Sequence, residues 1–188
     1  LKRYWDIDAT KKCNLTLEEK YNEFRRLFLD SIKLHMRADV EVGGCLSGGL
    51  DSSAIAGSVA RLLPEINFKT FTIYYEGKDE VDERPWVNEV LKENPSLKDF
   101  TFSPTDKDLV DNYEKAFYHA DVPMAGSSPI SQYFVMQLAS KHGIKVLLDG
   151  QGSDEYLAGY MHSFYRLVGG LLAKGKMMKA HDQFYSHA

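Results

Sequence analysis

Short apolar runs alternate along the chain with longer stretches in which apolar residues recur at helical spacing. Four runs rich in β-branched or aromatic residues predict buried strands over residues 40–46, 68–75, 98–103 and 144–148. Helical spacing predicts helices over residues 16–37, 54–63, 86–91, 109–120 and 131–142, with further helix from about residue 156 and over 171–187. Strands that alternate with helices predict an α/β fold with a parallel, twisted sheet and flanking helices. Ligands of such sheets bind at the carboxyl ends of the strands.

The composition limits the classes of function. The chain has 188 residues, 44% hydrophobic and 27% charged, which is ordinary for one globular α/β domain. A formal charge of -4 gives no basic field for nucleic acid, and no apolar run or leader pattern indicates a membrane or secretory segment. Cys13 and Cys45 lie far apart without a CxxC motif, and the histidines lack zinc spacing, so we expect a reducing, cytoplasmic compartment.

A glycine-rich loop, residues 47–53 (Ser-Gly-Gly-Leu-Asp-Ser-Ser), joins the first predicted strand to the helix after it. A strand, a glycine turn and a helix N-terminus form a phosphate cradle, because glycine lets the backbone approach the oxygens and free N–H groups point at them. No lysine follows the glycines, which excludes a Walker A loop. Asp51 would repel phosphate unless a divalent cation lies between them. The alternative is a serine–glycine turn with Asp51 near a helix N-cap.

A second loop, residues 149–155 (Asp-Gly-Gln-Gly-Ser-Asp-Glu), follows the last predicted strand. Alone it reads equally well as a turn with solvated acids. Because both loops follow strands, we expect them at the same edge of the sheet. Asp51 and Asp154 would then bridge a magnesium ion that also holds the phosphates.

The two loops carry a resemblance to a known family. Residues 46–53 resemble the PP-loop of ATP pyrophosphatases, and residues 146–160 resemble the second motif of the asparagine synthetases; residues 37–43 and 128–133 also match that family. NAD, GMP and argininosuccinate synthetases share only the first loop. The resemblance implies a Rossmann-like PP-loop ATP pyrophosphatase fold that is incomplete at its C-terminus. Residues 15–188 would form the front part of the synthetase domain, and residues 1–14 a linker from an absent N-terminal glutaminase domain.

The resemblance also implies the site residues and the cofactors ATP and Mg²⁺. Asp51 and Asp154 would be magnesium ligands and, with Gln151 and Glu155, the catalytic set. Leu46 and Ile73 would flank adenine through backbone groups. The full nucleotide-binding set would be Leu46, Ser47, Gly48, Gly49, Asp51, Ser52, Ser53, Ile73, Asp149 and Gly150. Many family members have Glu where this chain has Gln151, which cannot act as a base, and the family uses a lysine farther downstream than Ala188.

The family's activity gives the expected function. The resemblance implies an ATP-dependent ligase of asparagine biosynthesis, in which aspartate is adenylated, pyrophosphate leaves and ammonia displaces AMP. The N-terminal glutaminase domain of the same protein would supply the ammonia, as in glutamine amidotransferases. The residues leave open an amidotransferase or β-lactam-forming relative that acts on another carboxylate, and a truncated nucleotide-binding module without activity. We expect no nucleic-acid or membrane partner, leave homo-oligomerisation open, and expect the isolated chain to be inactive.

Overall fold

The computed structural model describes residues 2–8, 10–78, 82–121, 126 and 128–185. The chain divides into two compact units, residues 1–39 and 40–188. The first unit contains one described helix, α1 (Leu17–His35), which begins at a capping box. Thr16 Oγ1 accepts a hydrogen bond from the backbone N–H of Glu19, and the Glu19 carboxylate accepts one from the Thr16 N–H. The N-cap of α1 is therefore Thr16.

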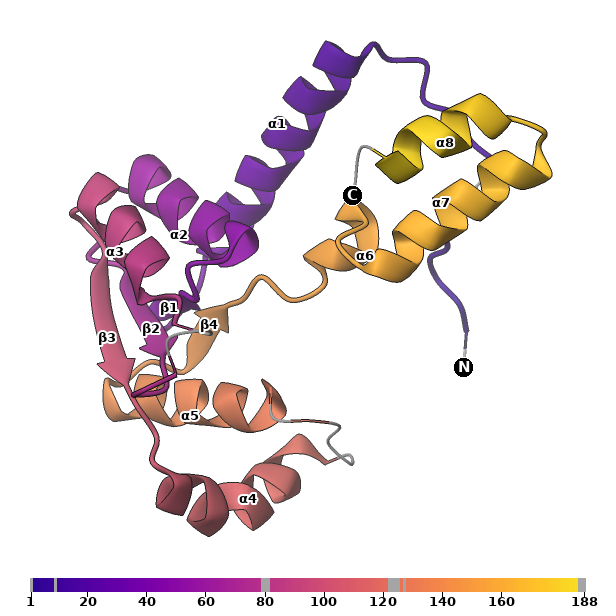
Figure 1. The fold of residues 1–188 in the computed structure, drawn as a ribbon. Helices are drawn as coiled ribbons and strands as arrows, with labels where there is room; N and C mark the ends of the chain where they lie inside the picture. The colour runs from indigo at the N-terminus through magenta and orange to yellow at the C-terminus, as the bar shows by residue number, and fades with distance from the viewer. Residues whose placement is uncertain (1, 9, 79–81, 122–125, 127, 186–188) are drawn as a thin grey trace. The chain divides into compact units, whose positions relative to one another are not determined.

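The second unit is built on a parallel sheet, which confirms the predicted fold class (Figure 1). In the described part of the chain its strands are β1 (Val42–Cys45), β2 (Lys69–Ile73), β3 (Lys98–Phe102) and β4 (Val146–Leu148). Their order is β3-β2-β1-β4, and every neighbouring pair is parallel. Each strand lies within one of the predicted runs, so the carboxyl ends of β1 and β4 deliver both glycine loops to one edge.

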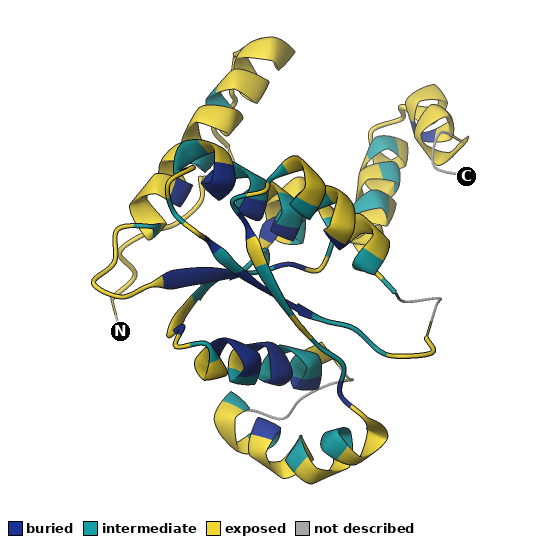
Figure 2. Cartoon of the chain, turned by 90° about the vertical axis from the view of Figure 1, so that its left-hand side faces the viewer, coloured by how far each residue is buried: buried dark blue, intermediate teal, exposed yellow. Residues whose placement is uncertain are grey.

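Helices cover both faces of the sheet (Figure 1). One face carries α2 (Leu50–Leu62) and α3 (Arg84–Glu93), and the other carries α5 (Ser128–Lys141), with α4 (Asp106–Ala120) packed against α5. Figure 2 shows the buried residues of α5 on the side that faces the strands. The core beneath α5 joins apolar side chains of the sheet and the helix, namely Phe71, Val135, Leu138, Ala139 and Ile144.

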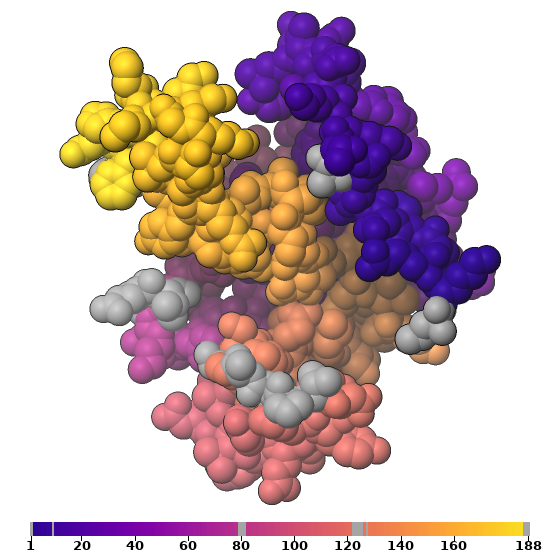
Figure 3. Space-filling model, turned by 90° about the vertical axis from the view of Figure 1, so that its right-hand side faces the viewer, coloured from indigo at the N-terminus to yellow at the C-terminus, as the bar shows by residue number. Residues whose placement is uncertain are grey.

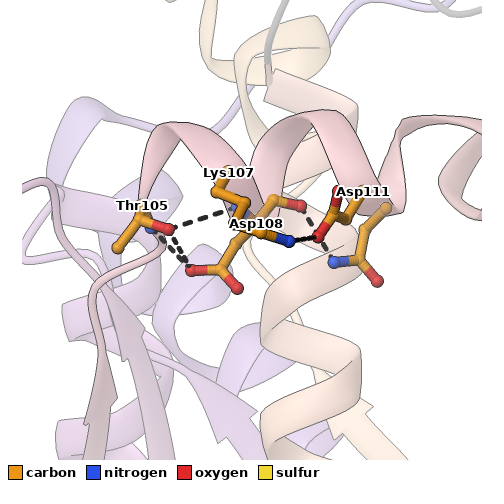
Figure 4. A network of polar contacts seen from close by, with 5 residues as sticks. Thr105, Lys107, Asp108 and Asp111 are labelled. Carbon is orange, nitrogen blue, oxygen red and sulfur yellow. Dashed lines mark hydrogen bonds and ion pairs between the residues drawn. The ribbon is translucent and has the colours of Figure 1, made fainter.

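A polar network fixes the start of α4 (Figure 4). Thr105 and Asp108 form a capping box, in which Asp108 Oδ2 accepts from the Thr105 N–H at 2.9 Å and Thr105 Oγ1 accepts from the Asp108 N–H at 3.2 Å. Lys107 pairs with Asp111 one turn along the helix. The box satisfies backbone donors that a helix start leaves unpaired, and it explains why α4 begins at Asp106.

The start of α5 differs from the sequence prediction, which placed this helix over residues 131–142. The helix already begins at Ser128, so Pro129 lies in its first turn. Proline is well placed there, because the first N–H groups of a helix have no intrahelical partner. Residues 122–125 and 127, just before this helix, lie outside the described residues.

The C-terminal part also differs from the prediction. The helix α6 (Ser153–Leu157) begins inside the predicted loop 149–155. The single stretch expected over residues 171–187 is interrupted, because α7 (Met161–Ala173) ends before Gly175, which has a φ of +69°, and α8 (Met177–Tyr185) follows. The two helices pack on each other, and Figure 3 shows their side chains gathered in one lobe. Among the described residues, no helix has both the length and the apolar character that crossing a membrane requires.

Candidate functional site

A cavity of about 510 Å³ opens at the carboxyl ends of β1, β2 and β4; we call it the edge cavity. Both glycine loops line it, which confirms that they lie at the same edge of the sheet. From the first loop and the residue before it come Leu46, Ser47, Gly49, Asp51 and Ser52, and from the second loop Asp149, Gly150, Gln151 and Asp154. The remaining wall is formed by Cys45, Phe71, Ile73, Tyr75, Glu83, Ser128, Ser131, Gln132 and Val135.

The Ser52 hydroxyl holds the first loop in shape. Its oxygen accepts a hydrogen bond from the Ser47 N–H at 3.2 Å and lies 3.0 Å from Ser47 Oγ, while its proton reaches the Gly49 carbonyl at 3.2 Å. Ser47 Oγ in turn accepts from the Gly49 N–H at 3.3 Å. Gly48 has a φ of +81°, and a β-carbon there would lie 2.9 Å from the Glu83 carbonyl, so this turn requires glycine.

The helix α2 begins inside this loop, at Leu50, earlier than the predicted start at residue 54. In an α-helix the first N–H groups have no intrahelical partner, and the partial positive charge of the helix N-terminus lies with them. Of the residues in this first turn, Asp51 and Ser52 line the edge cavity. A helix start at this position is where an anion would meet unpaired backbone donors, and anion binding by the loop stays a prediction.

Leu46, the residue before the loop, is fixed to the neighbouring strand. Its N–H donates to the Phe71 carbonyl at 3.1 Å, and its own carbonyl accepts from Thr72 Oγ1 at 2.6 Å. Its side chain is 1% exposed and lines the floor of the edge cavity. The position of the first loop is therefore set by β2, through one backbone and one side-chain hydrogen bond.

Asp99, a partly buried acid, lies next to Thr72, and the sequence did not indicate it as a site residue. Asp99 Oδ1 accepts from Thr70 Oγ1 at 2.7 Å and lies 3.1 Å from Thr72 Oγ1. Because a threonine hydroxyl has one proton, Thr72 donates either to Asp99 or to the Leu46 carbonyl. Burial raises the pKa of Asp99 to about 6, and the threonine hydrogen bonds oppose that rise.

The two loops approach each other closely at Gly150. A β-carbon on Gly150 would lie 2.9 Å from Asp51 Cβ and 3.2 Å from the Ser52 backbone nitrogen. Asp51 and Asp154, one from each loop, both line the edge cavity. Carboxylate oxygens are the ligands that Mg²⁺ prefers, so this donor set fits a magnesium ion whose other ligands are waters and phosphate oxygens. Within the described ranges no group of three or more His, Cys, Asp or Glu residues could hold a metal by itself.

The charge of the cavity wall also favours a bound cation. Its lining includes four carboxylates, Asp51, Glu83, Asp149 and Asp154, and no lysine, arginine or histidine of the described chain. A polyphosphate that enters this wall meets repulsion from the side chains and attraction only from N–H and hydroxyl donors. A divalent cation bound with the phosphate removes that repulsion.

Gln132 from α5 orients the acid at the start of the second loop. Its Nε2 donates to Asp149 Oδ2 at 2.8 Å, and Asp149 Oδ1 accepts from the Gln151 N–H at 3.2 Å. The Cys45 thiol lies 3.7 Å from Asp149 Oδ2. Burial, together with the Asp149 charge, raises the pKa of Cys45 to about 12, so the thiol stays protonated and is no nucleophile. The sequence signal for Gln132 was its place within the matched segment 128–133.

Three predicted site residues do not line the edge cavity. Gly48 shapes the turn, as described above. Ser53 lines a separate hollow between α2 and α3, and its buried Oγ has no hydrogen-bond partner in the described chain. Glu155 is exposed and accepts a hydrogen bond from the Tyr160 hydroxyl at 3.1 Å. Sequence reasoning also missed Tyr75 and Ser131, whose hydroxyls are hydrogen-bonded at the cavity wall.

Comparisons with known proteins agree with the resemblance. The asparagine synthase family model matches residues 23–183. Amidase chyE of Penicillium rubens is 30% identical over 175 residues, which cover 85% of this chain and 26% of the relative. Two glutamine-hydrolyzing asparagine synthetases of Bacillus subtilis match as well: number 1 at 36% identity (77% of this chain, 22% of the relative) and number 3 at 30% (84% and 27%). The chain thus spans roughly a quarter of the length of these relatives.

Proposed function

Because the chain belongs to the asparagine synthase family, we propose that it forms the ATP-binding part of an amide-forming ligase. The observation that carries this proposal is the meeting of two glycine loops, one after β1 and one after β4, around a single cavity. One loop offers backbone donors to phosphate, and each loop contributes one carboxylate for a cation. A simple turn with solvated acids would not need both loops at the same wall.

The nucleotide lies along the carboxyl edge of the sheet in this proposal. Its phosphates contact the start of α2, where the N–H groups of Asp51 and Ser52 have no intrahelical partner. By contrast, the Ser47 and Gly49 N–H groups are already bonded within the loop. Its base lies over the apolar floor near Leu46 and Ile73. Asp51 and Asp154 would hold Mg²⁺, which when bound neutralises charge on the phosphates and on the departing pyrophosphate.

Two bond exchanges would follow at this site. A β-carboxylate oxygen of aspartate forms a bond to the α-phosphorus of ATP while the bond to pyrophosphate breaks. Ammonia then attacks the acyl carbon, loses a proton, and AMP leaves with the bonding electron pair. The first step needs no base, because an aspartate side chain is already ionised at neutral pH. The protein contributes position and electrostatic stabilisation, which is why Gln151 in place of Glu is compatible with activity.

The ammonia would come from a glutaminase domain of the same protein. The Bacillus subtilis relatives carry the description glutamine-hydrolyzing, and this chain matches about a quarter of their length. We therefore propose aspartate and ammonia as substrates and a glutaminase domain in cis as partner.

A second candidate is amide chemistry on another carboxylate. It is favoured by two fungal relatives named as amidases, chyE of Penicillium rubens and chry2 of Gibberella zeae. The edge cavity differs from the pattern of many synthetases at Gln151, beside the nucleotide. In this alternative the ATP site is the same and only the acceptor differs.

Pyrophosphate release from Mg-ATP separates the candidates, measured on the natural full-length protein with ammonium and with aspartate, glutamate or no acceptor. We expect release that depends on aspartate and asparagine as the product. Release that depends on a different carboxylate supports the second candidate. No release with any acceptor, while Mg-ATP binds, contradicts the ligase proposal.

A further inference from the structure

The turn that follows α6 returns the backbone onto Asp154. The helix ends at Leu157, and the next residue, Ala158, adopts a left-handed conformation with a φ of +60°. This turn lets the N–H of Gly159 donate to the Asp154 carbonyl at 3.1 Å. Gly159 thereby lies directly beside one of the two carboxylates of the edge cavity.

The contact between Gly159 and the Asp154 side chain is exceptionally close. A β-carbon on Gly159 would lie 1.8 Å from Asp154 Oδ1 and 2.7 Å from Asp154 Cγ. Among the described glycines with a neighbour in reach, no other added β-carbon would approach another atom closer than 2.8 Å. The Asp154 carboxylate therefore occupies the space where any other residue would place its side chain.

Backbone conformation does not explain the glycine. Gly159 is absent from the described glycines with positive φ, so an alanine at this position would meet no left-handed strain. What it would meet is the carboxylate. Rotation about χ2, which is broad for aspartate, would move Oδ1 but leave Cγ at 2.7 Å, so relief of the contact requires the Asp154 side chain to rotate about χ1.

We propose that Gly159 is a positioning residue that directs the Asp154 carboxylate into the edge cavity. The role as a magnesium ligand rests on the function proposed above, whereas the contact itself stands on the geometry. Asp51 has a matching arrangement, because Gly150 packs against its Cβ. Each of the two acids thus has a glycine of the second motif packed against its side chain.

The test is the Gly159→Ala variant of this chain, with ATP affinity measured by calorimetry in Mg²⁺ and in EDTA. We expect Mg-ATP to bind about ten- to a hundredfold more weakly, the usual effect of disturbing a group that orients a metal ligand, with little change in EDTA. Gly170→Ala is the matched control, because its added β-carbon lies in open space on α7. Ala158→Gly alters the same turn without adding an atom near Asp154, and should also leave binding unchanged.

A double-mutant cycle tests whether the effect of Gly159→Ala arises from its contact with the Asp154 carboxylate. In an Asp154→Ala background, Gly159→Ala should cause no further loss of Mg-ATP affinity and no further fall in Tm, because the colliding carboxylate is gone. An equal loss in both backgrounds overturns the proposal, as does Mg-ATP binding by Gly159→Ala at parental affinity. If Gly159→Ala alone fails to fold, the double variant should fold again, and its failure to do so also overturns the proposal.

The two proposals fail separately. If the parent chain binds no Mg-ATP, the proposed function is contradicted for this chain, while the cycle of Tm values still tests the contact. A Gly159→Ala loss of Tm that vanishes in the Asp154→Ala background supports the positioning contact. A loss that persists contradicts it.

Discussion

Asp51 is the residue whose chemistry is least expected in an anion site and most informative there. It lies in the first turn of α2 and lines the edge cavity, and its Cβ contacts the second loop at Gly150. We predict that Asp51→Ala and Asp51→Asn weaken Mg-ATP binding about tenfold or more while leaving Tm close to that of the parent. Calorimetry with and without Mg²⁺ checks this. Parental affinity in both variants would contradict the role of Asp51 as a magnesium ligand.

Asp99 gives a prediction about how the stability of the chain depends on pH. Burial raises its pKa from 3.8 to about 6, so the folded chain binds this proton more tightly than the unfolded chain. Its contribution to stability is therefore full below pH 3.8 and is lost as the pH rises through 6. Asp99→Asn should make the chain more stable than the parent at pH 8, by an amount on the order of 2–3 kcal/mol, and equal or less stable at pH 4.

Urea unfolding at several pH values measures this difference, with Glu114→Gln as the control for removing an exposed carboxylate of α4. A constant difference between Asp99→Asn and the parent from pH 4 to pH 8 would show that Asp99 does not titrate in this range.

A substitution at Gln151 tests whether the adenylation of aspartate needs a base. It is exposed at the wall of the edge cavity, and its N–H donates to Asp149. We predict that Gln151→Glu changes the rate of pyrophosphate release by the full-length protein only a few-fold. A gain of about a hundredfold, the lower end of general-base contributions, would show that a base is needed there.

Single residues differ in how far the sequence reveals them. Asp51 and Asp154 stand in glycine loops directly after strands, so their common edge follows from the topology of a parallel sheet. Asp99 and Gln132 lie in an ordinary strand and an ordinary helix. The contact of Asp99 with Thr70 depends on which strands are neighbours in the sheet. The contact of Gln132 with Asp149 depends on how α5 is rotated against the sheet. A local sequence pattern fixes neither of these.

At the scale of elements, periodicity located the strands well and the ends of helices less well. Helix α5 begins earlier than predicted because proline is accepted in a first turn, and α6 begins inside a loop because a left-handed Gly152 starts it. The interruption at Gly175 lies within a stretch whose composition is helical throughout. Glycines with positive φ decide the boundaries at residues 152 and 175, and the sequence does not show which glycines adopt a positive φ.

The hydrogen bonds of Ser52 within the first loop give a further prediction. Because Ser52 joins Ser47 and Gly49 through one hydroxyl, Ser52→Ala should lower stability by about 1–2 kcal/mol and weaken ATP binding in Mg²⁺ and in EDTA alike. Ser58→Ala, on the same helix but outside the loop, is the control. Weakening seen only in Mg²⁺ would mean that Ser52 acts on the cation and not on the loop.

At the scale of the whole molecule, large apolar side chains remain exposed on the α7–α8 lobe, among them Leu172, Met178 and Phe184. Exposed apolar patches promote association. We therefore predict that the 188-residue chain associates with itself as its concentration rises, and that the Leu172→Lys, Met178→Lys double variant associates less. Sedimentation velocity measures this, with Tyr118→Lys on α4 as the control. A monomer at all concentrations would contradict the prediction.

We propose that Mg-ATP binds in the edge cavity, between the two glycine loops. The most direct measurement is the change in backbone amide NMR signals of this chain on titration with Mg-ATP. The account predicts the largest changes in residues 46–53 and 149–154, and smaller changes where α5 lines the cavity at Ser131 and Gln132. Changes centred on the α4–α5 groove at Ala116 and Tyr133, or no changes at saturating Mg-ATP, would contradict it.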